Sequence, residues 1–247
     1  MSMTTLKKWV LLFLKIMNNL ELKNVTLVAV SSIKIKETIN ALVSSMKNIS
    51  YGEVIFITHE RPLNLPDGIT FIKCDKITNI NMYSEFMAYE LHKYISTDFA
   101  LTVQYDGYVL NPKVWSIDFL NYDYIGAPWP KRFTPHLSDG TPIRVGNGGF
   151  SFRSKRLLNI LNELNLPFTD NGTGFYNEDG VLCVYYRKEL ERAGIKFAPV
   201  DIAAKFSHEL DCKESVKNPF GFHESKIVFP YFLWPIKSIL KKIGLNL

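Results

Sequence analysis

The chain has 247 residues, of which 47% are hydrophobic and 21% charged, and its formal net charge is +5 at pH 7. This is an ordinary globular composition, sufficient for one large domain or two small ones. The mild basic excess suits a phosphate-bearing ligand or an anionic lipid surface, or serves solubility alone. It is too weak and too scattered along the chain to predict nucleic-acid binding.

Two features bear on location. The three cysteines, Cys74, Cys183 and Cys212, have no metal-type spacing, and such an odd, sparse set predicts reduced thiols in a cytoplasmic protein. An apolar block at 9–14 follows two lysines, but Lys15 interrupts it and no cleavage site follows, so we expect no signal peptide. We expect residues 1–24 to form an amphipathic helix, either on a membrane surface or packed on the domain.

The front half alternates between strand and helix patterns. Short apolar or β-branched runs predict strands at 25–30, 53–58, 69–72 and 99–103. Apolar residues at helical spacing predict helices at 35–46 and 81–95, the second with a buried stripe of Tyr83, Met87, Leu91 and Tyr94. This alternation predicts an α/β fold, a single Rossmann-like domain whose mostly parallel central sheet is flanked by helices.

The back half has a different character. We expect a strand at 122–125, a proline-containing loop at 128–144, a strand at 150–153 and a helix at 154–164. A further helix is expected from Asn177 to about Gly194, with Leu182, Tyr185, Tyr186 and Leu190 on its buried side. Because no linker divides the chain, we expect one domain over 25–228, with a nucleotide-binding front half and an acceptor-binding back half.

The strand expected at 99–103 is followed by Gln104, Tyr105, Asp106 and Gly107. Ligands of open α/β sheets bind at the carboxyl ends of the strands. A carboxylate there suits a divalent cation that bridges to a diphosphate, and Gly107 would let another group approach closely. The alternative is an ordinary turn aspartate before a glycine.

Three later motifs could carry chemistry. The loop 146–149 has three glycines in four residues but lacks the spacing of dinucleotide or Walker loops, and it could be a simple tight turn. Glu178 and Asp179 could present a proton acceptor to a sugar hydroxyl, or merely begin a helix capped by Asn177. His223 could be a metal ligand or an exposed loop histidine.

Two aromatic segments leave alternatives open. Trp129 lies between two prolines and could stack on a sugar ring or belong to the core. The tail 229–247 combines apolar side chains with lysines, so it could lie on a membrane surface as a basic amphipathic helix or dock on the domain.

The order of these motifs resembles that of glycosyltransferases of the GT-A fold, which share an Asp-x-Asp metal motif, a glycine loop, an x-Glu-Asp motif and a C-terminal metal-binding histidine. More closely, residues 27–223 resemble a family of glycosyltransferase-like proteins catalogued as a domain of unknown function. The most specific strings are YDYIGAPW at 122–129 and VGNGGFS at 145–151, supported by 104–106, 178–179 and 220–223.

This resemblance implies a set of roles. Asp106 would bind Mn²⁺ or Mg²⁺ with His223 as a second ligand, and Asp179 would be the catalytic base with Glu178 beside it. The expected nucleotide-sugar site comprises Val30, Ser31, Thr58, His59, Gln104, Tyr105, Asp106 and Gly107. The expected donor and acceptor cleft comprises Trp129, Asn147, Gly148 and Gly149. Gln104 departs from the pattern, because it stands where the fold class has its first aspartate and leaves the site one negative charge short.

The implied function is transfer of a sugar from a nucleotide-sugar, with uridine as the expected nucleoside, to a hydroxyl of a glycan or lipid-linked glycan. A base at Asp179 implies inversion at the anomeric carbon. Two alternatives remain open: a nucleotidyl- or phosphotransferase with similar metal–diphosphate chemistry, and a non-catalytic glycan-binding protein of the same fold. We expect a cytoplasmic protein that contacts the inner face of a membrane if its termini bind lipid.

Overall fold

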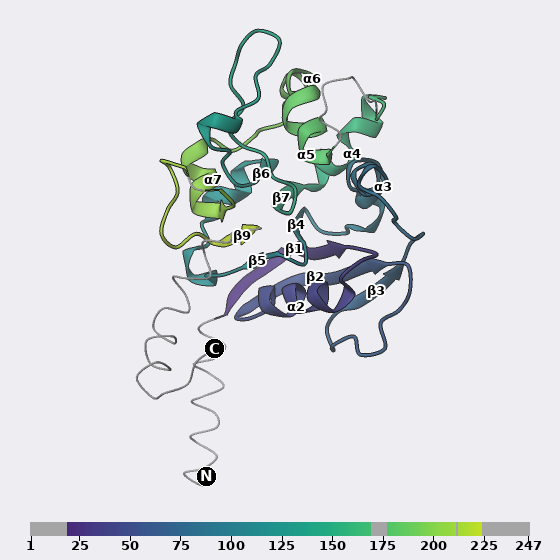
Figure 1. Ribbon diagram of the computed structural model, residues 1–247. Helices are drawn as coiled ribbons and strands as arrows, with labels where there is room; N and C mark the ends of the chain where they lie inside the picture. The colour runs from purple at the N-terminus through teal and green to yellow at the C-terminus, as the bar shows by residue number, and fades with distance from the viewer. Residues whose placement is uncertain (1–18, 169–176, 211, 224–247) are drawn as a thin grey trace.

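The computed structural model describes residues 19–168, 177–210 and 212–223 (Figure 1). Most of the segment expected as an N-terminal helix (1–24), and the whole expected basic tail (229–247), lie outside the described residues. The proposed membrane contacts of the two ends therefore stay predictions.

A six-stranded sheet with the order β3-β2-β1-β4-β7-β6 forms the centre of the molecule. Its strands are β1 (Leu20–Val30), β2 (Ile49–Thr58), β3 (Thr70–Lys73), β4 (Phe99–Val103), β6 (Tyr124–Ile125) and β7 (Phe150–Ser154). The first four pair in parallel, whereas β7 runs antiparallel to both β4 and β6. The predicted α/β class with a mostly parallel sheet is confirmed.

The first strand begins earlier than expected. Leu20 pairs with Ile49 and Leu22 with Tyr51, so residues 20–24 are strand and not the end of a helix. The cause is visible in the sequence, because apolar Leu20 and Leu22 alternate with polar neighbours at the strand period of two. A register shift between Leu22 and Thr26 separates this pairing from the longer buried part of β1.

Both faces of the parallel strands are covered, as their continuous apolar sequences require. Helix α2 (Ile35–Ser45) packs Leu42 against one face, in a cluster that includes Phe56 and Leu101. On the other face Val28 and Ile57 meet Met87, Leu91 and the α4 residue Leu158. Helix α4 spans Lys155–Glu163, and Figure 1 shows it with α3 on the side of the sheet away from α2.

The helices predicted at 81–95 and 177–194 are each divided. The first consists of α3 (Ile80–Glu85), a π-helical turn (Phe86–Glu90) and a 3₁₀ turn (Leu91–Tyr94). The second consists of α5 (Glu178–Gly180), a π-helical segment (Val181–Tyr185) and α6 (Arg187–Arg192). Tyr185 is 39% exposed, so its expected place in the buried stripe is wrong. The wider π turn changes the angular spacing of Val181–Tyr185 relative to a regular helix, so Tyr185 does not share the buried face of Leu182 and Tyr186.

A second, three-stranded sheet was not predicted. It has the order β5-β9-β8, with β5 (Gly107–Val109), β8 (Ser207–His208) and β9 (Gly221–His223), and α7 (Val200–Phe206) leads into it. Single 3₁₀ turns at Pro112–Val114, Ile117–Asn121 and Lys131–Phe133 complete the described elements. Buried Phe119, Phe150, Phe206 and Phe220 join the small sheet to the large one.

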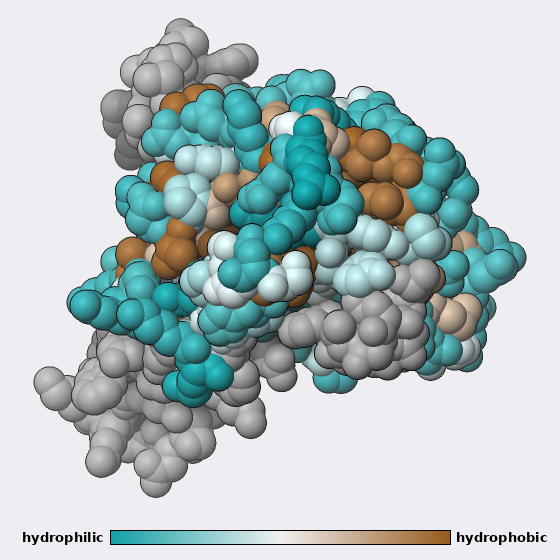
Figure 2. Space-filling view, turned by 90° about the horizontal axis from the view of Figure 1, so that it is seen from above, coloured by the Kyte–Doolittle hydropathy of each residue, from teal (hydrophilic) through white to brown (hydrophobic). Residues whose placement is uncertain are grey.

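On the face seen in Figure 2, apolar side chains lie in separate patches between hydrophilic ones. Among the residues that the structure describes, no helix has the length and apolarity needed to cross a membrane.

Candidate functional site

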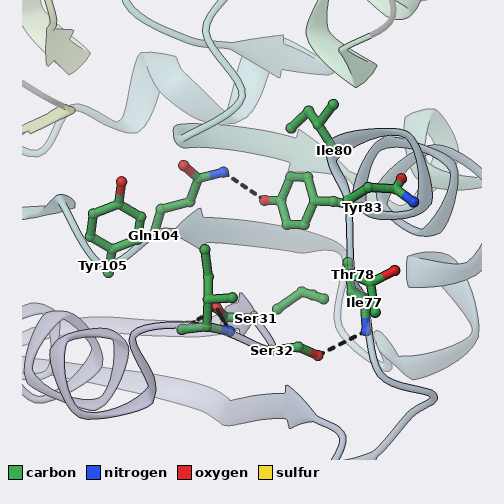
Figure 3. A pocket seen from close by; sticks show the side chains of 11 residues that line it. Ser31, Ser32, Ile77, Thr78, Ile80, Tyr83, Gln104 and Tyr105 are labelled. Carbon is green, nitrogen blue, oxygen red and sulfur yellow. Dashed lines mark hydrogen bonds between the residues drawn. The ribbon is translucent and has the colours of Figure 1, made fainter.

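A pocket of about 340 Å³ lies where the chain leaves the carboxyl ends of β1 and β4 (Figure 3). In the order β3-β2-β1-β4 this is the topological switch point, where α/β sheets bind their ligands. Three segments wall it, residues 30–33 after β1, residues 77–80 with Tyr83, and residues 104–105 after β4. None of the 11 described residues that line the pocket carries a charged side chain.

Hydrogen bonds hold these three segments together. The backbone N–H of Ile77 donates to Ser32 Oγ at 2.9 Å, which joins the segment after β1 to the loop before α3. Asn79 caps α3 by accepting from the Met82 N–H at 2.9 Å. Gln104 Nε2 donates to the Tyr83 hydroxyl at 2.8 Å, which joins the end of β4 to α3 (Figure 3).

Four of the residues expected at the nucleotide site lie in the wall of this pocket: Val30, Ser31, Gln104 and Tyr105. Thr58 and His59 are not among its lining residues, and Thr58 is fully buried. The reason is topological, because β2 lies on the side of β1 away from β4. At the edge of the pocket the Lys34 ammonium lies 3.7 Å from the centre of the Tyr105 ring.

The small sheet brings Asp106 and His223 together. β5 pairs antiparallel with β9 so that Gly107 lies opposite His223. His223 Nε2 is then 3.5 Å from Asp106 Oδ1 and 3.1 Å from Gln104 Oε1, while its Nδ1 is 3.2 Å from Glu209 Oε1. The imidazole is therefore surrounded by oxygen atoms on both of its nitrogens.

These contacts shift the pKa values of both His223 and Asp106. Burial by itself would lower the pKa of His223, but its contacts with Asp106 and Glu209 outweigh burial and raise the pKa to about 9. Burial would raise the pKa of Asp106, but interaction with the His223 imidazole outweighs it and lowers the pKa. Asp106 Oδ1 is nevertheless buried with no hydrogen-bond partner among the described residues.

That orphaned carboxylate oxygen fits a divalent cation. The cationic neighbour of Asp106 Oδ1 in the described structure is the His223 imidazole at 3.5 Å, so a divalent ion held by both side chains would take the place of the Nε2 proton and give Oδ1 the close partner that it lacks. The carboxylate of Glu209 on the other imidazole nitrogen is the usual outer partner of a metal-binding histidine. Within 19–168, 177–210 and 212–223, no three His, Cys, Asp or Glu side chains are grouped to hold an ion, so other atoms would have to complete the coordination.

Close contacts with neighbouring side chains explain why the loop 146–149 contains three glycines. A Cβ on Gly149 would lie 2.0 Å from His223 Nε2, and one on Gly148 would lie 1.8 Å from Glu178 Oε1. A Cβ on Gly146 would lie 1.9 Å from the Trp129 ring, so Trp129 packs directly on this loop. Only glycine permits these three approaches, and the loop thereby touches functional candidates on both sides.

Asp179 accepts hydrogen bonds from the same loop. Its Oδ2 accepts from the N–H groups of Asn147 at 3.0 Å and Gly148 at 3.3 Å, and its Oδ1 accepts from Gly180 N at 2.8 Å. Burial and the neighbouring charge of Glu178 raise the pKa of Asp179 to about 6. A carboxyl with this pKa is mostly ionised at neutral pH.

Glu178 has a different environment. Its Oε1 forms a 2.9 Å ion pair with Arg153 Nη2, and both side chains are buried. Arg153 also donates from Nε to Ser151 Oγ at 2.9 Å. Contact with Glu178 outweighs burial and raises the pKa of Arg153. Glu178, expected beside the catalytic base, is therefore engaged in an internal ion pair that joins α5 to β7.

Sequence reasoning missed three members of this site. Arg153 carried a signal, because it is a charged residue at the end of the strand expected at 150–153. The helical spacing of Tyr83 predicts only a buried helix face, whereas in the structure its side chain lines the pocket. Glu209 had no local signal, because only the folding of residues 207–223 brings it to His223.

Comparison with known proteins gives one family and one structural relative of note. The family model described as "Protein of unknown function (DUF5672)" matches residues 68–223, a range that contains Asp106, Asp179 and His223. No curated protein matches the chain. A solved structure of "a glycosyltransferase involved in the glycosylation of the major capsid of PBCV-1" is similar, with 14% identity and a TM-score of 0.48. The match covers 87% of this chain and 98% of the other.

Proposed function

This chain belongs to the family described as protein of unknown function (DUF5672), and we propose that it is a metal-dependent glycosyltransferase. It would move a sugar from a nucleoside-diphosphate sugar to a hydroxyl of a glycan or lipid-linked glycan. One observation carries the proposal: the loop 146–149 contacts His223 on one side and Asp179 on the other, next to the switch-point pocket. A cation site, a proton acceptor and a ligand pocket thus adjoin one another.

The pocket suits the nucleoside. Its wall of serine, threonine, amide, aliphatic and tyrosine side chains offers hydrogen bonds and apolar contact without charge, which a neutral base and ribose require. Tyr105 and Gln104 form the wall next to Asp106, so a diphosphate attached to the nucleoside would extend toward the Asp106–His223 pair. Uridine is the nucleoside that the sequence resemblance implies.

Asp106 Oδ1 and His223 Nε2 would hold Mg²⁺ or Mn²⁺, with phosphate oxygens among the remaining ligands. When bound, such an ion neutralises the charge that develops on the departing diphosphate. Glu209 would hold the His223 ring through Nδ1 so that Nε2 faces the site. Gly107 and Gly149 leave the space that the imidazole occupies.

Asp179 would take the proton of the acceptor hydroxyl. A carboxylate offers about four lone-pair positions, and three backbone N–H groups leave one of them free for a substrate. The same three bonds fix the carboxylate in place, which favours a positioned base. Direct attack by the acceptor with Asp179 as base gives inversion at the anomeric carbon.

The proposal is tested by incubating the purified chain with a panel of nucleotide-sugars and Mn²⁺, with and without a chelator. Release of a nucleoside diphosphate that the chelator stops would support glycosyl transfer or donor hydrolysis. Release of pyrophosphate from a nucleoside triphosphate supplied together with a sugar 1-phosphate would instead identify a nucleotidyltransferase. Specific binding of a nucleotide-sugar, seen as a rise in melting temperature, with no turnover of any donor would identify a non-catalytic binding protein.

A further inference from the structure

The carbonyl oxygen of Gly148 lies among three hydrogen-bond donors. The hydroxyls of Thr102 on β4 and Ser151 on β7 each lie 3.3 Å from this oxygen and 2.7 Å from one another, and Arg153 Nη2 lies 3.5 Å from it. Arg153 also donates from Nε to Ser151 Oγ at 2.9 Å, and all three side chains are buried. These contacts fix the loop 146–149 to the paired strands β4 and β7.

The same glycine directs its N–H group at the proposed base. Asp179 Oδ2 accepts from Gly148 N at 3.3 Å. Glycine has more backbone freedom than any other residue, so this donor keeps its direction only if the rest of Gly148 is held in place. Because Arg153 and the two hydroxyls hold the carbonyl side, the N–H group stays directed at the carboxylate.

Glu178 lies against Gly148 as well. Its Oε1 is 2.9 Å from Arg153 Nη2, and a Cβ on Gly148 would lie 1.8 Å from the same oxygen. Two carboxylates and one guanidinium therefore surround this glycine. Burial and then the negative charge of Glu178 raise the pKa of Asp179, and the attraction of Arg153 for the carboxylate is weaker than that repulsion.

We infer that Arg153 and Glu178 act on the reaction through Asp179. Arg153, together with the two hydroxyls, is the positioning residue that fixes Gly148 and hence a backbone donor of the proton acceptor. Glu178 supplies the negative charge that sets the pH above which the acceptor is available. The inference rests on Asp179 as the base of the proposed function. It gives the buried ion pair a role in the reaction besides its role in stability.

The other ionisable groups near the base do not change charge in the range where it titrates. Burial raises the pKa of three of them well above the usual range, so they stay neutral: Tyr83 on α3, Tyr124 on β6 and Cys183 in the π-helical segment. Glu209, which follows β8, also raises the pKa of Asp179, but by less than Glu178 does. A change in the midpoint of Asp179 after substitution of Glu178 therefore reports on the Glu178 charge.

The first experiment titrates the carboxyl of Asp179 by ¹³C NMR of the full chain in chelator, with the signal assigned by its absence from Asp179→Asn. The wild-type midpoint should lie at about 6. Glu178→Gln removes the neighbouring charge and keeps the size of the side chain, so its midpoint should be lower. Glu189→Gln removes an exposed acid in the first turn of α6 and should leave the midpoint unchanged.

The second experiment tests how Gly148 is held. Arg153→Lys keeps the charge but lacks the guanidinium fork, and Thr102→Val removes one hydroxyl in a variant that is easier to fold. In both, hydrogen exchange of the Gly148 amide should be roughly 2–10-fold faster, as for one weakened hydrogen bond. The kcat should fall by up to about 10²-fold, as for a misplaced catalytic group, with KM for the donor unchanged.

Thr26→Val is the matched control for the second experiment. Thr26 is a buried strand threonine whose hydroxyl lies 2.7 Å from that of Thr97, and it pairs with Ala100 on the same strand β4. This variant also loses a buried hydroxyl, so it measures any general effect of reduced stability. Exchange at Gly148 and kcat should both stay at the wild-type values.

The outcomes separate the inference from the function on which it rests. An unchanged midpoint in Glu178→Gln would overturn the role of the charge. Wild-type exchange at Gly148 in both Arg153→Lys and Thr102→Val would overturn the positioning role, and in either case Asp179 could still be the base. If Asp179→Asn turns over a donor at the wild-type rate, the proposed base and the inference fall together.

Discussion

His223 Nε2 lies 3.5 Å from Asp106 Oδ1, although Asp106 follows β4 and His223 ends β9. The pairing of Gly107 with His223 in the β5–β9 ladder creates this proximity. Glycines at 107 and 149 leave room for the imidazole between the two strands and the loop 146–149. The candidate site therefore depends on backbone register as much as on its ionisable side chains.

The glycine at 149 should be essential for cation binding. In Gly149→Ala the new Cβ would lie 2.0 Å from His223 Nε2, so the ring must move away from Asp106. We expect a 10–100-fold loss of Mn²⁺ affinity by titration, as for other disrupted metal sites, and a loss of about 1–3 kcal/mol in unfolding free energy from overpacking. Gly140→Ala is the control, because nothing lies within 4 Å of its Cβ and only its φ of +83° opposes the change. Wild-type Mn²⁺ affinity in Gly149→Ala would contradict this account.

The metal-free protein should lose stability as the pH rises from 7 to above 9. The pKa of His223 is near 6.5 in an unfolded chain and is raised to about 9 in the fold, so its contribution is complete below pH 6.5 and is lost as the pH passes 9. The loss is at most about 3 kcal/mol. Urea unfolding with chelator across this range measures it. His223→Gln should remove most of the dependence, whereas His59→Gln, outside this cluster, should leave it intact. An unchanged slope in His223→Gln would disprove the assignment.

Turnover should depend on the ionisation of Asp179. Since burial and Glu178 raise the pKa of this carboxyl to about 6, we expect the rate at saturating donor to rise with pH below 6 and to level off above it. Asp179→Asn should lower the rate by about 10²–10⁴ while donor binding by calorimetry persists. Asp201→Asn, in the first turn of α7, is a control for the removal of an acidic group at a helix start. A variant at position 179 that keeps the wild-type rate would exclude the base role.

The buried pair of Arg153 and Glu178 should matter for stability. Arg153→Met leaves the Glu178 carboxylate buried without its partner, which should cost about 3–5 kcal/mol in unfolding free energy. Glu178→Gln keeps the shape and one hydrogen bond, so we expect a folded protein whose turnover stays within about tenfold of the wild type, below the loss typical of a missing acid or base. Denaturant titration and donor turnover, measured on the same samples, separate the two effects. A catalytic role would instead appear as a large loss of turnover at unchanged stability.

The periodicity of the sequence located most of the central sheet and its covering helices. The runs at 25–30, 53–58 and 99–103 all lie in strands, because a strand covered on both faces must be apolar at consecutive positions, although the first two strands begin earlier, at Leu20 and Ile49. The helix at 35–45 was found for the related reason that its apolar residues repeat at the helical period. The two π-helical turns were not anticipated, since an extra residue in a turn leaves the local composition unchanged.

By itself, then, the sequence determined the α/β class, the strand that leads to Asp106, and the glycine content of the loop 146–149. Only the tertiary structure decided that Glu209 supports His223, that Arg153 holds Glu178 in the interior, and that Tyr83 orients Gln104. The difference has a physical cause. Burial of one face requires apolar residues to repeat at a fixed spacing, so it can be recognised in the local sequence. Packing and strand register decide the two- and three-residue strands and the side-chain pairs between distant segments, and neither leaves a local sequence pattern.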